Sequence, residues 1–215
     1  MSGTGRSLTP PRAAAVAGVV FSVLMGISLA IIRLAVPTFE SDTGAWLSDP
    51  TRTGAVHHAI QLVPFAGVAF LWFIGVLRNR LGDLEDKFFA TVFLGSGLLF
   101  VASLFAAAAF AGSLLETQVH SQNPQLNGDV YYLARVLIRS FLNVFAIKMA
   151  GVFTFSTSMV VFRTHILPRW VAFAGFASAI VLLLVITSWP WIALIFPLWM
   201  LLISTTILVS DFRRA

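Results

Sequence analysis

Lys148 is the residue whose type and position most suggest a chemical role. It lies inside a long hydrophobic block, nine residues after Arg139 and fourteen before Phe162, which places it roughly 14 Å and 21 Å from those ends of a helix. A lysine at that depth costs about 2.5–3.5 kcal/mol on insertion scales. Thr154 and Ser158 fall with it inside an arc of about 120° at about 100° per residue. The pattern therefore predicts an intramembrane polar pocket formed by Lys148, Thr154 and Ser158, the alternative being a lipid-facing lysine that snorkels outward.

A second group of chemistry-bearing side chains falls at the outer ends of two predicted spans. His57 and His58 begin one span, and Glu116 and His120 end the next with a spacing of four residues. Imidazole and carboxylate groups are common metal ligands, so these four residues predict a metal site if the two helix ends meet. Hydrated interfacial histidines are the other interpretation.

The sequence carries no motif that assigns a reaction. HExxH, GxSxG, P-loop and GxGxxG patterns are all absent. There is no cysteine, which excludes disulfides and thiolate chemistry, and no Asp or Glu falls inside a predicted span. We therefore expect no cofactor and name no catalytic residue, and we do not favour enzymatic activity.

The elements that position these residues are membrane spans. Of the 215 residues, 58% are hydrophobic and 11% charged, with a mean hydropathy of +0.90, which excludes an ordinary soluble domain. Since a span needs about 20 apolar residues, we predict an all-α integral membrane bundle of six transmembrane helices in a single domain. The predicted spans are 13–36, 58–77, 88–112, 140–162, 171–188 and 191–209, with tails at 1–12 and 210–215.

Basic residues set the predicted orientation. Inner segments would hold nine Lys or Arg, against three in outer segments (Arg52, Arg135 and Arg139), and two, Arg33 and Lys148, lie within spans. This asymmetry follows the positive-inside rule and predicts that both termini are cytoplasmic. The net charge is +5, and the basic residues that produce it are scattered among the hydrophobic segments. The expected partner is therefore the lipid bilayer and not nucleic acid.

Small residues predict how the spans pack. Gly18, Ser22, Gly26 and Ala30 recur every four residues in the first span, which lets helix backbones approach closely in lipid. Packing inside the bundle is the favoured interpretation. A homo-oligomer formed through these faces is the alternative.

One segment resembles a known pattern. Residues 163–170 read Arg-Thr-His-Ile-Leu-Pro-Arg-Trp, and Gly175 follows inside the next predicted span. This resembles an inner-loop Leu-Pro-Arg-Trp pattern of bacterial multi-span membrane proteins classed as domains of unknown function. The resemblance implies a bacterial cytoplasmic membrane location and carries over no functional residue.

Three classes of function stay open at this point. A non-enzymatic structural or partner-assisting membrane protein is weakly favoured, because the loops are short and the charges follow topology. A small-solute carrier or channel using a polar pocket around Lys148 is the alternative, and a membrane enzyme or metal-binding protein is third. A polar cavity reaching Lys148 would favour transport, whereas a fully packed apolar bundle would favour the structural role.

Overall fold

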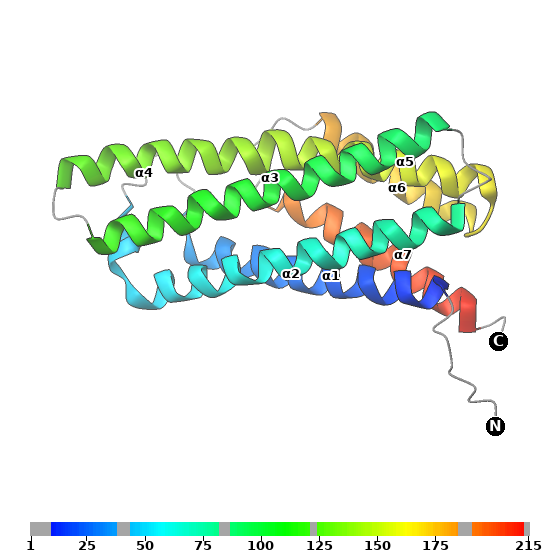
Figure 1. Cartoon of the computed structure of the whole chain (residues 1–215), viewed down its shortest axis with the longest axis horizontal. Helices are drawn as coiled ribbons and strands as arrows, with labels where there is room; N and C mark the ends of the chain where they lie inside the picture. Colours follow the sequence, from blue (N-terminus) through cyan, green and yellow to red (C-terminus); the bar gives the residue numbers. More distant parts are fainter. Residues whose placement is uncertain (1–9, 38–43, 82–86, 121–123, 185–190, 213–215) are drawn as a thin grey trace, which may run out of the picture.

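The computed structural model describes residues 10–37, 44–81, 87–120, 124–184 and 191–212, and at several edges of these ranges, His120 included, only the backbone. Within them the chain is helical (Figure 1). The long elements are α1 (Pro10–Ala35), α2 (Pro50–Leu81), α3 (Lys87–His120), α4 (Pro124–Arg139), α5 (Ile147–Thr164), α6 (Arg169–Leu184) and α7 (Ile195–Phe212). Short 3-10 helices η1 (Ala45–Ser48) and η3 (Ile192–Leu194) and a π-helical segment η2 (Ser140–Ala146) join them.

The predicted all-α, multi-span character is confirmed. Five helical stretches of the described chain are long and apolar enough to cross a membrane: Arg12–Ala35, Pro50–Arg78, Thr91–Thr117, Gly128–Thr164 and Ile192–Ser210. The remaining predicted span, 171–188, corresponds to α6, a shorter apolar helix of 16 residues. Its predicted continuation beyond Leu184 lies outside the described residues.

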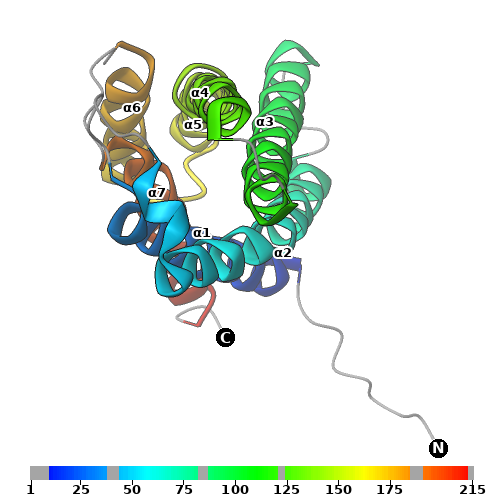
Figure 2. The ribbon, with the colours of Figure 1, turned by 90° about the vertical axis from the view of Figure 1, so that its left-hand side faces the viewer.

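The helices form a ring around the bundle axis (Figure 2). α1 packs against α2 and α7, α3 packs against α2 and the α4–α5 rod, and α6 packs against α5. The start of α1 and the end of α7 lie at the same end of the bundle (Figure 1), as an even number of crossings requires. We call this the inner end, after the predicted orientation, and the opposite end the outer end.

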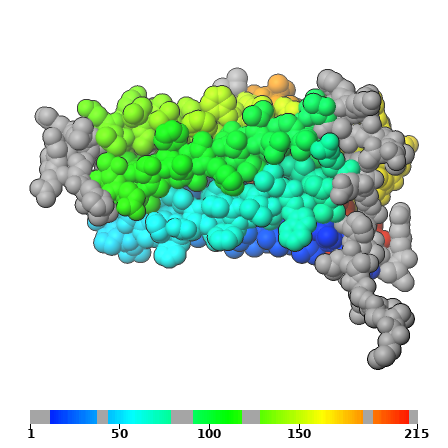
Figure 3. All heavy atoms as spheres, viewed as in Figure 1, coloured from blue at the N-terminus to red at the C-terminus, as the bar shows by residue number. Residues whose placement is uncertain are grey.

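The helices differ greatly in length, and this shapes the outer end. α2 and α3 have 32 and 34 residues, or about 48 Å and 51 Å. α6, with 16 residues, is about 24 Å long, close to the roughly 30 Å of a bilayer core once its flanking residues are added. The outer parts of α2, α3 and α4 therefore extend beyond the level at which α6 ends. On the face drawn in Figure 3, the described side chains of α2 and α3 meet along their length.

The helical stretch that contains the predicted span 140–162 is continuous but not uniform. α4, η2 and α5 follow one path (Figure 1), with the π-helical segment at Ser140–Ala146. A π-segment inserts one extra residue into a helical turn and rotates the side chains on either side of it relative to each other. Hydrophobic periodicity did not predict this segment.

Five phenylalanine rings close the centre of the bundle. They come from α1, α2, α3, α5 and α7, and all are buried: Phe21, Phe70, Phe100, Phe153 and Phe196. Ring centroids lie 4.8 Å apart for Phe21 and Phe70, 5.2 Å for Phe70 and Phe100, and 4.8 Å for Phe100 and Phe196. We call this group the phenylalanine cluster. These separations are typical of packed aromatic pairs, so the cluster joins the helices tightly on the inner side of the cavity described below.

The small-residue stripe of α1 packs inside the bundle at one end. A Cβ on Gly18 would overlap the Ser204 hydroxyl of α7 and lie 3.0 Å from the Phe73 ring. Ser22 is buried and donates a hydrogen bond of 2.7 Å to the Gly18 carbonyl. Gly26 has open space around it, so close packing explains only part of the stripe.

The segment 163–170 forms the turn between α5 and α6. His165 adopts the left-handed conformation with φ of 53° and ends α5, its N–H donating to the Val161 carbonyl. The Arg169 guanidinium lies 3.0 Å from His165 Nε2, and the Pro168 carbonyl accepts from the Val171 N–H. These local bonds give the Leu-Pro-Arg-Trp segment a structural role as a tight helix-to-helix turn.

Candidate functional site

The outer half of the bundle contains a partly open cavity of about 550 Å³. Its walls come from α1 and the two residues after it, η1, α2, α3, α4, η2 and the start of α5, with one residue of η3. Four cationic residues line it: Arg33, Arg135, Arg139 and Lys148. Its other polar lining residues are Ser28, Trp46, Tyr131, Ser140 and Asn143. No Asp or Glu occurs among the described residues that line it.

Three of the four cations are arginines near the outer end. Arg33 comes from the last turn of α1, while Arg135 and Arg139 are one turn apart on α4. The Arg33 and Arg139 guanidinium groups are close enough for their like charges to interact, and Arg33, Arg135 and Arg139 are each partly buried. Because like charges gathered at partly dehydrated positions repel, this part of the cavity favours a negatively charged occupant.

Lys148 is held by the end of a neighbouring helix. Its Nζ donates hydrogen bonds to the carbonyls of Leu183 at 2.7 Å and Leu182 at 3.2 Å. These carbonyls belong to the last described turn of α6, near the negative end of the helix dipole. A cation there is stabilised without a carboxylate. Lys148 therefore points into the bundle and caps α6 at one edge of the cavity.

The level of Lys148 along the bundle follows from the length of α5. It lies 16 residues before the end of α5 at Thr164, or about 24 Å from the inner end of that helix, beside the last described turn of α6. The α4–α5 rod continues outward from there (Figure 1). The mid-bilayer depth of Lys148 stays a prediction.

Thr154 and Ser158 lie on the side of α5 that faces the interior of the bundle, but they are not among the residues that line the cavity. Both are buried, and the Ser158 hydroxyl donates to the Thr154 carbonyl at 2.7 Å. A Cβ on Gly175 of α6 would overlap the Ser158 hydroxyl, which shows how closely α5 and α6 approach there. The structure thus brings Lys148 together with three arginines and places Thr154 and Ser158 in a packed helix contact.

Sequence reasoning did not assign Arg33, Arg135 and Arg139 to a site. The available signal was Arg33 inside an otherwise uncharged span, and two arginines, Arg135 and Arg139, spaced by four residues just before the predicted span 140–162. Each position was consistent with an interfacial charge. Only the packing of α1 opposite α4 across the cavity shows that they belong together.

Trp46 and Tyr131 join η1 to α4 at the outer edge of the cavity. Trp46 Nε1 donates to the Tyr131 hydroxyl at 3.2 Å, and both residues are buried. Gly44, with φ of +83°, precedes η1, and a Cβ there would lie 3.2 Å from the Tyr131 ring. The left-handed backbone and the close approach both require glycine.

The residues of the predicted metal site lie at the outer end of the bundle. His57 and His58 are exposed on α2, and their ring nitrogens contact Gln61 and the Gly54 carbonyl of the same helix. Glu116 is exposed on α3, and the His120 side chain lies outside the described residues. Among the described side chains no group of three His, Cys, Asp or Glu could hold a metal. The four-residue metal site stays a prediction.

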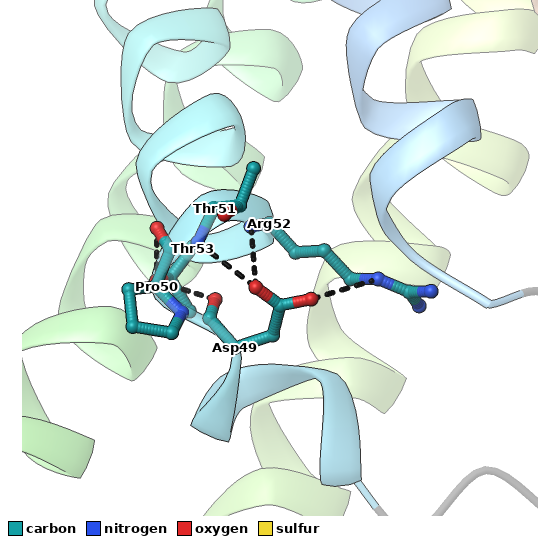
Figure 4. Close-up of polar contacts among 5 residues, drawn as sticks. All are labelled: Asp49, Pro50, Thr51, Arg52 and Thr53. Carbon is teal, nitrogen blue, oxygen red and sulfur yellow. Dashed lines mark hydrogen bonds and ion pairs between the residues drawn. The ribbon is translucent and has the colours of Figure 1, made fainter.

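Arg52 offers a useful contrast to the cavity arginines. It lies in the first turn of α2, half-exposed, with its Nε 3.3 Å from Asp49 Oδ2 (Figure 4). The other Asp49 carboxylate oxygen accepts the Thr51 N–H at 2.9 Å, which caps the helix. Arg52 is therefore an outer-end arginine that is paired with a carboxylate and is not among the residues that line the cavity.

No family model, curated protein or solved structure matches the chain. The fold and the apolar helices define its class: it is an all-α, multi-span membrane protein.

Proposed function

We propose that this protein binds an anionic molecule in the cavity lined by Arg33, Arg135, Arg139 and Lys148. The observation that carries the proposal is the gathering of four cations around one cavity whose described lining includes no carboxylate. Buried or half-buried cations are normally paired. A negatively charged ligand would provide a countercharge for Arg33 and Arg139.

The arginines suit this role chemically. A guanidinium group stays charged and presents a planar set of donors that matches carboxylate or phosphate oxygens in a bidentate manner. Arg33 and Arg139 approach the cavity from opposite helices, so one anion between them would be bound from two sides. Binding would also relieve their mutual repulsion.

The cavity supports a carrier-type function over a purely structural one. A bundle that only holds a partner needs no cavity of this size with charged walls. At its inner end the cavity lining stops at Met25, Val63 and Leu104. The phenylalanine cluster begins four residues further inward, with Phe21 on α1 and Phe100 on α3. This arrangement favours a site accessible from the outer side and closed toward the inner side, so release inward would require the phenylalanine cluster to separate.

The test is anion binding by variants of the full-length protein in phosphatidylcholine nanodiscs. Isothermal titration with hexyl phosphate, and with hexanol as the uncharged analogue, compares Arg33→Gln, Arg139→Gln and the matched control Arg52→Gln. Charge-assisted hydrogen bonds are worth about 1.5–3 kcal/mol, so either cavity substitution should weaken binding by about 10- to 150-fold. Arg52→Gln should bind as the unaltered protein does. Equal binding by all four proteins, or no binding of the phosphate, would refute the proposal.

A further inference from the structure

We infer that the anion is the headgroup of an amphiphile with one apolar chain. Its headgroup lies between Arg33 and Arg139, and its chain runs inward along the cavity toward Met25 and Leu104. This inference rests on the proposed function and adds the chemical class of the ligand. Three features of the cavity support it: its size, the distribution of polar groups along it, and its level in the bundle.

The cavity is too large for an inorganic anion. At about 30 Å³ of liquid volume per water, its 550 Å³ corresponds to about eighteen waters. Phosphate or sulfate would leave most of that space unfilled. The volume falls within the roughly 300–1,000 Å³ of pockets that hold one drug-sized molecule, which fits one chain with a headgroup better than a two-chain lipid.

The three arginines lie toward the outer end of a long cavity. On α1 the lining extends from Met25 to Arg33, or about 12 Å along the helix, and Val36 and Pro37 continue it beyond the end of α1. Inward of Arg33, Ser28 donates to the Ala59 carbonyl and Lys148 donates to the α6 carbonyls. The other walls there are largely apolar, built from Met25, Leu29, Ile32, Ile60, Val63, Leu104, Ala107, Ala108, Leu142 and Ile147. An apolar chain would bury its surface there while an acidic group stays at the arginines.

The level of the arginines matches that of lipid headgroups. Arg33 lies 21 residues after Arg12 on α1, or about 32 Å from that inner-end cation. The hydrocarbon core of a bilayer is about 30 Å thick, so Arg33 falls at the opposite polar boundary. A ligand with its head at Arg33 and its chain pointing inward has the orientation and depth of a lipid in the outer leaflet.

The short α6–α7 pair would give such a ligand a lateral path. α6 ends at Leu184, beside Lys148, and α4 packs chiefly against α3. Outward of that level, η1 is joined to α4 by the Trp46–Tyr131 hydrogen bond, and none of the long helices of the described chain lies there between α4 and α1, so we place the entry inward of that bond. On the opposite side α2 and α3 close the wall (Figure 3). The chain would therefore enter between α1 and α4 from the outer leaflet.

The experiment is a chain-length series on the unaltered full-length protein in phosphatidylcholine nanodiscs, with empty nanodiscs correcting for partitioning. The probes are inorganic phosphate and butyl, octyl and dodecyl phosphate, with dodecanol as the uncharged analogue and dipalmitoyl phosphatidic acid as the two-chain analogue. Expressed against the aqueous concentration, affinity should rise by up to about fourfold per added methylene. Dodecyl phosphate should bind at least 100-fold more tightly than phosphate, dodecanol or the two-chain lipid.

Each of the other outcomes overturns a different part of the inference. Equal affinity for phosphate and dodecyl phosphate would overturn the amphiphile and leave anion binding standing. Equal affinity for dodecyl phosphate and the two-chain lipid would overturn the single chain. Equal affinity for dodecyl phosphate and dodecanol, or no binding of any phosphate, would overturn the proposed function as well.

A pair of alanine substitutions on α3 tests the path of the chain. Ala107 is buried and lines the cavity, whereas Ala102 is exposed on the same helix. Ala107→Phe should weaken dodecyl phosphate binding at least tenfold by filling the chain site, and Ala102→Phe should leave it unchanged. Equal affinities of the two variants would overturn this placement of the chain.

Discussion

At the scale of single residues, the charged groups inside the bundle divide into two kinds. Lys148 has its positive charge satisfied by protein groups, since its ammonium bonds to two α6 carbonyls. Arg33 and Arg139 instead line the cavity from two different helices, close enough for their like charges to interact. The first arrangement stabilises the fold, and the second favours a ligand. Substitution of Lys148 should therefore lower the stability of the fold, whereas substitution of Arg33 or Arg139 should weaken anion binding.

Replacing Lys148 by methionine should destabilise the protein. The substitution keeps most of the side-chain length but leaves the Leu182 and Leu183 carbonyls without their donor. Hydrogen bonds involving a charged group are worth about 1.5–3 kcal/mol, so thermal unfolding in detergent should show a loss of that order. Lys148→Arg, which keeps a donor and a charge, should recover part of it. Unchanged or raised stability of the methionine variant would show that Lys148 is an incidental charge.

At the scale of elements, the outer end is shaped by helices of unequal length. α2 and α3 have at least twice as many residues as α6, whose last described turn lies beside Lys148. The π-helical segment Ser140–Ala146 lies at this level on the α4–α5 rod, between Arg139 and Lys148. It sets the relative directions of the two cationic side chains that flank it.

Two glycines on one face of α1 should respond in opposite ways to alanine. Gly18→Ala places a methyl group against Ser204 and the Phe73 ring, and overpacking of this kind costs about 1–3 kcal/mol. Gly26→Ala meets open space and should be neutral or stabilising by up to about 1 kcal/mol, because alanine favours the helix. Thermal unfolding of the two variants in the same detergent measures both effects. Equal stability of the two would contradict the close approach of α1 and α7.

At the scale of the whole molecule, the two halves of the bundle have different roles. The inner half is tightly packed around the phenylalanine cluster and close helix contacts such as that of Gly175 with Ser158. The outer half is looser and contains the cationic cavity. If the termini are cytoplasmic, as the basic residues predict, the cavity faces the outer side. The direction of any ligand movement depends on that orientation.

Cysteine labelling tests the orientation directly, because the chain has no native cysteine. Ser48 of η1 and Gly128 of α4 are exposed at the outer end, and His165 is exposed at the inner α5–α6 turn. A membrane-impermeant thiol reagent should label Ser48→Cys and Gly128→Cys in intact cells. His165→Cys should be labelled only after permeabilisation. The reverse pattern would invert the topology and place the cavity on the cytoplasmic side.

The membrane class and most of the helices could be predicted from the sequence, because an apolar run of sufficient length satisfies its backbone in lipid only as a helix. That constraint is local, and so are the small-residue stripe and the uncharged block 171–209, which makes up most of α6 and α7. The partners of Arg33, Arg139 and Lys148 are not local. They depend on which helices are neighbours, on where α6 ends, and on the rotation introduced by a π-helical segment. Periodicity placed Lys148, Thr154 and Ser158 on one face, but only tertiary packing decided that Lys148 borders a cavity with three arginines while Thr154 and Ser158 fill a helix contact.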